Sequence, residues 1–335
     1  MAIRVLIVDD SAFMRKIISD MMKEFRDIEV VGTARNGIDA LEIIPNLNPD
    51  IITLDVEMPG LNGIETLKEI KRRTNIPVIM LSSNSRPEIT IEALEHGAID
   101  FIEKPVNIGS NFSEIKSDIE HKIKNYFNEN LLDSRVLQKN PVSKSTQVNR
   151  RYEALVIGAS TGGPKALVQL VSRLPKNTRI PVFIVQHMPK GFTTSLAERM
   201  DRESQIKVVE AQNGMNIDSG TVYLAPGDYH MVIVKDQIML QSTEKIHGVR
   251  PAVDYLFFSA AEKYKEKLLA VILTGMGKDG SDGMSRIKEA GGYNIAQDKE
   301  SSIVFGMPGS VISRGVVDEI LSLEDISKTL NRMVR

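Results

Sequence analysis

The chain contains no cysteine among its 335 residues. This absence excludes disulfide bonds, thiolate metal sites and a cysteine nucleophile, and it fits a reducing compartment. No apolar run reaches the roughly 20 residues that a membrane-spanning helix needs. The apolar run at the start is too short for the core of a secretory signal and has no cleavage site after it. We therefore expect a cytoplasmic protein with no segment inserted into a membrane.

The chain also has little net charge and no repeats. Its formal net charge is −2 at pH 7, so the charge balance does not indicate a nucleic-acid partner. We find no internal repeat of the length that builds a solenoid. Hydrophobic residues make up 42% of the chain, which is enough for two cores. At about 150 residues per domain, the length predicts two domains.

Short apolar runs rich in Val and Ile alternate with helix-period segments over residues 1–127. This alternation predicts an α/β domain with a parallel sheet covered by helices on both faces. A helix near Ser113–Phe127 closes the predicted domain. The predicted strands are Ile3–Val8, Ile28–Thr33, Ile51–Leu54, Val78–Leu81 and Ile99–Ile102.

Residues 128–151 are polar, contain Pro141 and are typical of a linker. Beyond them the alternation resumes, which predicts a second three-layer α/β domain over residues 152–335 with a mainly parallel sheet. Two strands around Asp236 predict an antiparallel hairpin at the edge of that sheet. The predicted strands are Glu153–Ile157, Ile180–Gln186, Ile206–Val209, Thr221–Leu224, Met231–Val234, Gln237–Leu240, Leu268–Leu273 and Tyr293–Ala296.

Acidic side chains follow two strands of the first domain. Asp9 and Asp10 come after the first strand and Asp55 after the third, so all three lie at the carboxyl edge of a parallel sheet, where ligands bind. Their mutual repulsion calls for a cation, and Mg²⁺ prefers oxygen ligands. Ser82 ends the fourth strand and Lys104 follows the fifth. One such residue is commonly a solvated turn residue, but together they predict a phosphate site with Asp55 as the nucleophile.

The stretches VLIVDDSAFMR, DIITLDVEMPGLNGIETL, PVIMLSS and GAIDFIEKP resemble the receiver domain of two-component response regulators over residues 1–127. The resemblance implies a flavodoxin-like sheet of five parallel strands and phosphorylation of Asp55. It also implies that Mg²⁺ is held by Asp9 or Asp10, Asp55 and the backbone carbonyl of Glu57. The implied switch residues are the Ser82 hydroxyl, the Phe101 ring and Lys104, whose bond to Pro105 is expected to be cis.

A second motif, Gly158-Ala-Ser160-Thr-Gly162, follows the first strand of the second domain. A G-x-S-x-G turn between a strand and a helix lifts the serine hydroxyl clear of the backbone, and N–H groups at the helix start can stabilise an oxyanion. The alternative is a glycine-rich turn in which the serine caps the helix. Ser160 is therefore a candidate nucleophile.

Partners for Ser160 follow two other strands. His187 stands at the end of the next strand, and Asp279 follows Leu268–Leu273 at the start of a helix. A carboxylate there can accept the second ring N–H of His187 and fix its tautomer. His230 is the rival base. The chain order Ser, His, Asp differs from the Ser, Asp, His order of the α/β-hydrolases.

Three other functions compete with a hydrolase. A phosphate-binding P-loop around Gly158 fails because Pro164 stands at the lysine position. Gly275-x-Gly277-x-x-Gly280, with Asp298 after the next strand, matches a dinucleotide fingerprint but leaves Ser160 and His187 unexplained. A DNA-binding response regulator needs a basic helix-turn-helix after the linker, and the sequence contains none.

The stretches IGASTGGP, VFIVQHMP, VYLAPGDYHM and ILTGMGKDG resemble the catalytic domain of CheB-type chemotaxis protein-glutamate methylesterases. The resemblance implies hydrolysis of glutamate γ-methyl esters on chemoreceptors, release of methanol, and deamidation of glutamine. It implies that the chemotaxis histidine kinase supplies the phosphate and that the second domain needs no cofactor. Ser160, His187 and Asp279 become the implied triad, with a main-chain N–H near Met276 as an oxyanion donor.

Overall fold

The computed structural model describes residues 2–83, 86–104, 112–131 and 151–335. Contacts divide the chain into two units, Met1–Asn128 and Glu129–Arg335, and each is described by itself. Most of the predicted linker and Pro105 lie outside the described residues. Within the described part, no helix combines the length and the apolar character that crossing a membrane requires.

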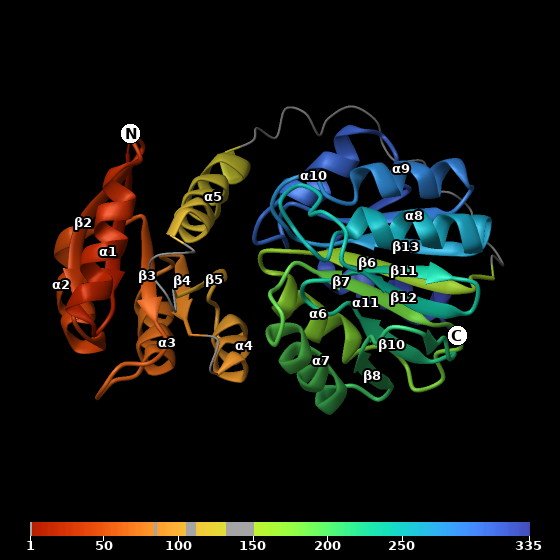
Figure 1. Cartoon of the computed structure of the whole chain (residues 1–335), viewed down its shortest axis with the longest axis horizontal. Helices are drawn as coiled ribbons and strands as arrows, with labels where there is room; N and C mark the ends of the chain where they lie inside the picture. The colour runs from red at the N-terminus through yellow and green to blue at the C-terminus, as the bar shows by residue number, and fades with distance from the viewer. Residues whose placement is uncertain (1, 84–85, 105–111, 132–150) are drawn as a thin grey trace. The chain divides into compact units, whose positions relative to one another are not determined.

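The first unit contains the predicted sheet of five parallel strands, in the order β2-β1-β3-β4-β5 (Figure 1). Every residue of β3 and β4 is buried, as expected for strands covered on both faces. The elements are β1 (Ile3–Val8), α1 (Ala12–Lys23), β2 (Ile28–Ala34), α2 (Gly37–Leu47), β3 (Ile51–Asp55), α3 (Gly63–Arg73), β4 (Val78–Ser82), α4 (Pro87–Glu95), β5 (Asp100–Glu103) and α5 (Phe112–Leu131).

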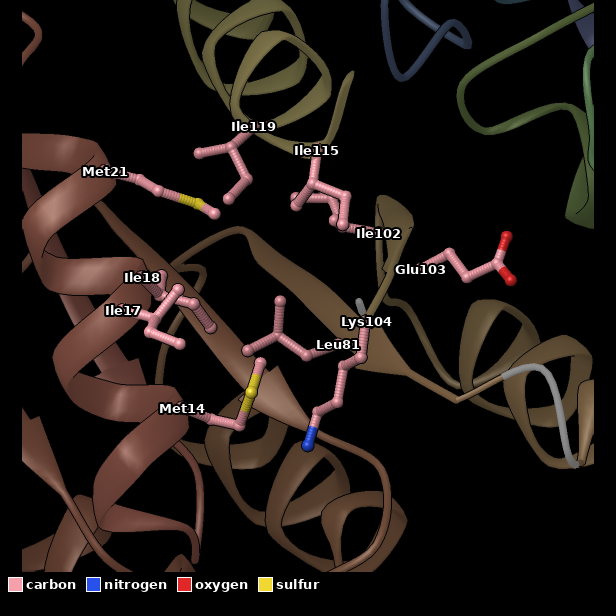
Figure 2. A pocket seen from close by; sticks show the side chains of 10 residues that line it. All are labelled: Met14, Ile17, Ile18, Met21, Leu81, Ile102, Glu103, Lys104, Ile115 and Ile119. Atoms are coloured by element: carbon pink, nitrogen blue, oxygen red, sulfur yellow. The ribbon is translucent and has the colours of Figure 1, made fainter. Parts of the chain in front are cut away.

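Helices α1 and α5 pack on the same face of this sheet. Met14 and Met21 of α1 line a small hollow with Ile115 and Ile119 of α5, over Leu81 and Ile102 of the sheet (Figure 2). Apart from Glu103 and Lys104 at its border, the lining residues are apolar, so the hollow belongs to the core rather than to a polar ligand site.

The second unit is built on seven parallel strands in the order β15-β14-β13-β6-β7-β10-β8. Helices α8, α9 and α10 lie on one side of the sheet, and α6 and α7 on the other (Figure 1). The elements of the sheet and its helices are β6 (Ala154–Ala159), α6 (Gly163–Val171), β7 (Val182–Gln186), α7 (Phe192–Glu203), β8 (Lys207–Glu210), β10 (Thr221–Leu224), α8 (Val253–Tyr264), η2 (Lys265–Lys267), β13 (Leu268–Ile272), α9 (Ser281–Glu289), β14 (Tyr293–Gln297), α10 (Gly306–Ser313), β15 (Glu319–Leu321) and α11 (Leu323–Met333).

The predicted hairpin forms, but its predicted place at the edge of the main sheet was wrong. Strands β11 (His230–Val234) and β12 (Gln237–Gln241) pair antiparallel and, with β9 (Met215–Asn216), make a separate three-stranded sheet. Met231 and Ile233 of β11 are buried in one cluster with Leu256 and Phe257 of α8. The hairpin therefore covers its apolar face with a helix, whereas the edges of the main sheet are β15 and β8.

The predicted strands differ from the observed ones only at their ends. Strands β9 and β15 escaped the sequence analysis because two or three residues are too few to show a period. The predicted α/β fold class is confirmed for both units.

Candidate functional sites

Three adjacent strands in the middle of the seven-stranded sheet carry the predicted hydrolase residues. Strand β6 pairs with β7 on one side and with β13 on the other. Ser160 follows β6, His187 follows β7, and Asp279 lies in the loop after β13. The chain changes direction across the sheet at β6, and such a switch point opens a crevice at the carboxyl ends of the strands. The structure therefore brings all three residues to one edge.

The turn from β6 into α6 fixes the backbone of Ser160 on both sides. Its N–H donates to the Thr274 carbonyl at 3.1 Å, and its carbonyl accepts from Gly163 N at 2.7 Å. Gly162 has φ +78°, a left-handed conformation that favours glycine. Within residues 151–335 the hydroxyl of Ser160 has no recorded hydrogen bond, and the residue is partly exposed. Its backbone is held while its Oγ stays available.

His187 and Asp279 form a close pair. His187 Nε2 lies 2.8 Å from Asp279 Oδ2, so the ring donates its Nε2–H to the carboxylate and Nδ1 remains to accept a proton. The His187 side chain is only 10% exposed. The pair fixes the tautomer as the sequence analysis expected, and the ring meets Asp279 through Nε2.

Asp279 lies just before α9, and its buried carboxylate faces the first N–H groups of α8. Oδ2 accepts from Val253 N at 2.6 Å, and Oδ1 accepts from Asp254 N at 3.1 Å and from Gly280 N at 2.9 Å. Burial favours the neutral acid, but the hydrogen bond and charge of His187 and the N–H donors of α8 hold the pKa of Asp279 below its usual value. Asp279 therefore stays negative beside the imidazole.

Two buried polar residues that the sequence analysis missed position the site. Gln186 Nε2 donates to the Ser160 carbonyl at 2.9 Å and to the His187 carbonyl at 3.2 Å. Thr274 Oγ1 donates to the Thr161 carbonyl at 2.9 Å, beside the serine. A glutamine ending the apolar strand VFIVQ was the available signal, because a buried polar side chain needs partners.

His230 is built into the core rather than into the crevice. It is fully buried, its Nδ1 accepts from Ala252 N at 3.1 Å, and its Nε2 donates to the Glu244 carbonyl at 3.0 Å. The ring stacks on Tyr255 at 3.9 Å. Burial lowers the pKa of His230, so the ring stays neutral with both nitrogens occupied. This environment argues against the rival base.

The loop after β13 lies against Ser160. A side chain added at Gly275 would reach within 2.8 Å of Ser160 Cβ, so the two backbones are in contact there. Gly275 N donates to the Val304 carbonyl and Thr274 N to Gln297 Oε1. By contrast, within residues 151–335 the Met276 N–H has no recorded acceptor. The Met276 N–H is therefore a candidate donor near the nucleophile.

The same loop is poorly suited to a dinucleotide. The N–H groups of Gly275 and Gly280 already donate to protein oxygens, and the Asp279 carboxylate occupies the helix start where a pyrophosphate would bind. Asp298, the expected ribose partner, accepts from the main chain and hydroxyl of Ser301. These contacts disfavour the alternative raised by the glycine fingerprint.

The five-stranded sheet gathers the predicted phosphate site at its own carboxyl edge. Lys104 Nζ lies 2.7 Å from Asp9 Oδ2 and 2.7 Å from Asp55 Oδ2. In Figure 2 its ammonium extends away from Met21 and Ile119. Burial and the charge of Asp9 outweigh the Lys104 contact and raise the pKa of Asp55 to about 6.

The carboxylates at this edge fit a magnesium ion. Carboxylate oxygens of Asp9, Asp10 and Asp55 lie within 4.8 Å of one another. Asp9 Oδ2 is buried, and Lys104 Nζ at 2.7 Å is its close partner among the described residues, so the oxygen keeps a lone pair for a cation. The Glu57 N–H donates to Asp55 Oδ1 at 3.1 Å, which puts the Glu57 backbone beside the same cluster. A hard cation among these oxygens would relieve their repulsion.

Ser82 and Phe101 lie on neighbouring strands. The Ser82 hydroxyl is 2.5 Å from Thr90 Oγ1 of α4, and the two bury this contact. Phe101 is 4% exposed, and Lys122 of α5 stands 5.2 Å from its ring centroid. In this structure the Ser82 hydroxyl is thus held by Thr90 of α4 and by the Ser83 carbonyl, and Phe101 is packed inward under α5.

The folds and sites define a response regulator joined to an α/β domain with a serine–histidine–aspartate constellation. Residues 155–330 match the CheB methylesterase family, and residues 5–116 match the response regulator receiver domain. The chain belongs to the CheB methylesterase family.

Relatives cover the chain from end to end. A protein of Pyrococcus abyssi named protein-glutamate methylesterase/protein-glutamine glutaminase is 44% identical over 99% of this chain and 94% of its own. One of the same name from Thermotoga maritima is 46% identical over 99% and 98%. The crystal structure of the Thermotoga maritima CheB methylesterase catalytic domain, 47% identical, covers 55% of this chain and 100% of its own with a TM-score of 0.53.

Proposed function

We propose that this chain is a phosphorylation-activated protein-glutamate methylesterase that also deamidates glutamine. Its substrates are γ-methyl esters on methyl-accepting chemoreceptors, and a chemotaxis histidine kinase supplies the phosphate. It acts in the cytoplasm at membrane-bound receptor arrays, in sensory adaptation. The proposal assigns residues 1–127 to the receiver, 128–151 to the linker and 152–335 to the hydrolase. One observation supports it: Ser160 and His187 follow the adjacent strands β6 and β7, and His187 pairs with Asp279, which follows the neighbouring strand β13.

In the proposed mechanism Ser160 is the nucleophile. His187 Nδ1 takes the Oγ proton as the oxygen attacks the ester carbonyl, and Asp279 stabilises the imidazolium through Nε2. The proton then passes to the leaving oxygen, so methanol departs and an acyl-serine remains. Water, deprotonated by the same ring, attacks the acyl-serine and releases glutamate. A glutamine substrate follows the same path and releases ammonia.

The tetrahedral intermediate carries an oxyanion that needs a donor. The Met276 N–H, beside Ser160 and without another acceptor in residues 151–335, is the proposed donor. A preorganised N–H of this kind is typically worth about 10²- to 10³-fold in rate. The hydroxyl of Ser160 turns toward His187 when substrate binds, since catalytic hydrogen bonds commonly tighten only in the complex.

In the receiver, Asp55 is the proposed phosphoacceptor. Asp9, Asp10, Asp55 and the Glu57 carbonyl hold Mg²⁺, which would neutralise charge on the entering phosphoryl group. Lys104 pairs with the new phosphate oxygens. The Ser82 hydroxyl leaves Thr90 to donate to the phosphate, and Phe101 follows into the vacated space. Phosphorylation thereby changes the packing of α4 and β5.

Methanol release from methylated receptor tests the proposal directly. We expect the full-length chain to release methanol, and a small phosphodonor with Mg²⁺ to raise the rate. Unmethylated receptor is the control, because it offers no ester. A purified, folded chain that releases no methanol under either condition would contradict the proposed activity.

The two histidines give a second test. His187→Gln should lower kcat by on the order of 10³-fold or more, because the serine loses its base. His230→Gln should keep most of the activity while the protein stays folded, since the ring serves the core. An inactive His230 variant beside an active His187 variant would reverse the assignment.

A further inference from the structure

Asp254 is a buried carboxyl that the proposed mechanism does not use. Its side chain is 2% exposed in the first turn of α8. Its Oδ1 accepts from Gly283 N at 2.7 Å, which ties α8 to α9. Its own N–H donates to Asp279 Oδ1 at 3.1 Å. Asp254 therefore supports the proposed triad carboxylate through its backbone and places a second carboxyl next to it.

The two neighbouring carboxyls have unequal partners. Asp279 accepts from the His187 ring and from the N–H groups of Val253, Asp254 and Gly280, a set that suits a carboxylate. Asp254 accepts from one main-chain donor within residues 151–335, Gly283 N. When two close carboxyls hold one proton, it resides on the one with fewer donors. Asp254 is therefore the neutral partner, able to donate its own hydrogen bond.

The surroundings of Asp254 also favour placing the shared proton on Asp254. Burial first, and then the charge of Asp279, raise the pKa of Asp254 to about 7. Asp282 on α9 adds a further negative charge, which its pairing with Arg314 at 2.5 Å partly offsets. His247 Nε2 lies 3.9 Å from Asp254 Oδ2. Within residues 151–335, Asp279, Asp282 and His247 are thus titratable groups close to Asp254, and His187 lies on the other side of Asp279.

We propose that Asp254 is a positioning residue, a role that rests on the proposed hydrolase function. Its neutral carboxyl donates to Asp279 and holds that carboxylate against the His187 ring. Ionisation of Asp254 removes the donor and sets a second negative charge beside Asp279. The repulsion loosens the Asp279–His187 pair, so kcat falls as the pH rises. Substrate does not touch Asp254, so KM stays the same.

The pH profile of the full-length chain tests this role. We measure kcat and KM in EDTA, so that divalent cations do not screen the carboxyls. The unsubstituted chain should lose roughly fivefold in kcat between pH 6.5 and about 8.5, a coupling of less than one pKa unit. Asp254→Asn should keep its activity near pH 6.5 and lose this alkaline limb, because the amide donates at every pH. Asp254→Ala should lose roughly tenfold or more throughout.

A matched control, Asp282, lies in the first turn of α9. Asp282→Asn removes a charge that disfavours the ionised form of Asp254, without touching Asp279. Its alkaline limb should therefore persist and move to lower pH. A residue that merely stabilised the fold would lower activity in both Asp254 variants without changing the shape of the profile.

A readout independent of hydrolysis separates this role from the proposed function. The ring signals of His187 in the full-length chain, followed by nuclear magnetic resonance, should show a second inflection as Asp254 ionises, and Asp254→Asn should remove it. If no form of the chain hydrolyses the ester, the proposed function is wrong. The titration still shows whether Asp254 contacts Asp279 as proposed. Any one of three results overturns the proposal. The inflection is missing, the fall in kcat at high pH persists in Asp254→Asn, or Asp254→Ala is as active as Asp254→Asn.

Discussion

Ser160→Ala should lower methanol release by on the order of 10⁴-fold or more while the chain stays folded. The turn that holds Ser160 is built from main-chain contacts and Gln186, so removing the hydroxyl leaves the turn intact. The members of such a triad act as a unit, so His187→Ala should be similarly severe and the double variant little worse. Steady-state rates on methylated receptor, with circular dichroism to check folding, measure this expectation.

Ser219→Ala is the matched control for the nucleophile. Ser219 is exposed in the turn before β10, well separated along the chain from the three strands that carry the site. This variant should match the unsubstituted chain in rate and in labelling by a fluorophosphonate probe. Labelling should vanish in Ser160→Ala. Near-normal hydrolysis by a folded Ser160→Ala chain would remove the serine mechanism.

Asp55→Asn should abolish the response to a phosphodonor. In the unsubstituted chain we expect phosphorylation to raise the hydrolysis rate by roughly 5- to 150-fold, the usual range of coupling between two sites. Asparagine keeps the shape of Asp55 but cannot form the acyl phosphate. Asp50→Asn is the control, because Asp50 lies just before the opposite end of the same strand and accepts only from Arg4 N among the described contacts. A full response in Asp55→Asn would mean that the switch is elsewhere.

Deleting residues 1–140 distinguishes two forms of control. We expect inhibition, in which the unphosphorylated receiver restrains the hydrolase and phosphorylation removes that restraint. The fragment should then be at least as active as the phosphorylated whole chain. The solved catalytic domain of the Thermotoga maritima relative supports testing this part alone. A fragment no faster than the unphosphorylated chain would favour direct activation by the phosphorylated receiver.

The sequence was sufficient to predict the location of those site residues whose position follows from the order of the strands. Each of these residues stands at or just after an apolar strand, and parallel strands bring such positions to the carboxyl edge of their own sheet. They are Asp9, Asp55 and Ser82 in the first sheet and Ser160 and His187 in the second. That rule needs no coordinates, because the strand period and the right-handed crossover already fix the edge. The G-x-S-x-G turn and the acid cluster could therefore be interpreted before the fold was known.

The place of the hairpin depended on the tertiary structure. Its strands were predicted from alternation, but alternation alone does not tell whether an apolar face packs on a sheet edge or on a helix. Met231 and Ile233 join the cluster with α8, so the hairpin forms its own sheet. The same holds for His230. No local sequence pattern predicts that its ring is buried against Tyr255.

What the sequence by itself determined is which residue types stand at the strand ends, and hence the chemistry available there. Only the tertiary structure decided their electrostatic state. Asp279 stays charged because the His187 ring pairs with it and because the start of α8, more than twenty residues earlier in the chain, points Val253 N and Asp254 N at it. Gln186, Thr274 and Asp254 act through long-range contacts of the same kind. The charge and orientation of these side chains depend on groups that folding brings together. The local sequence does not determine the distances between such groups.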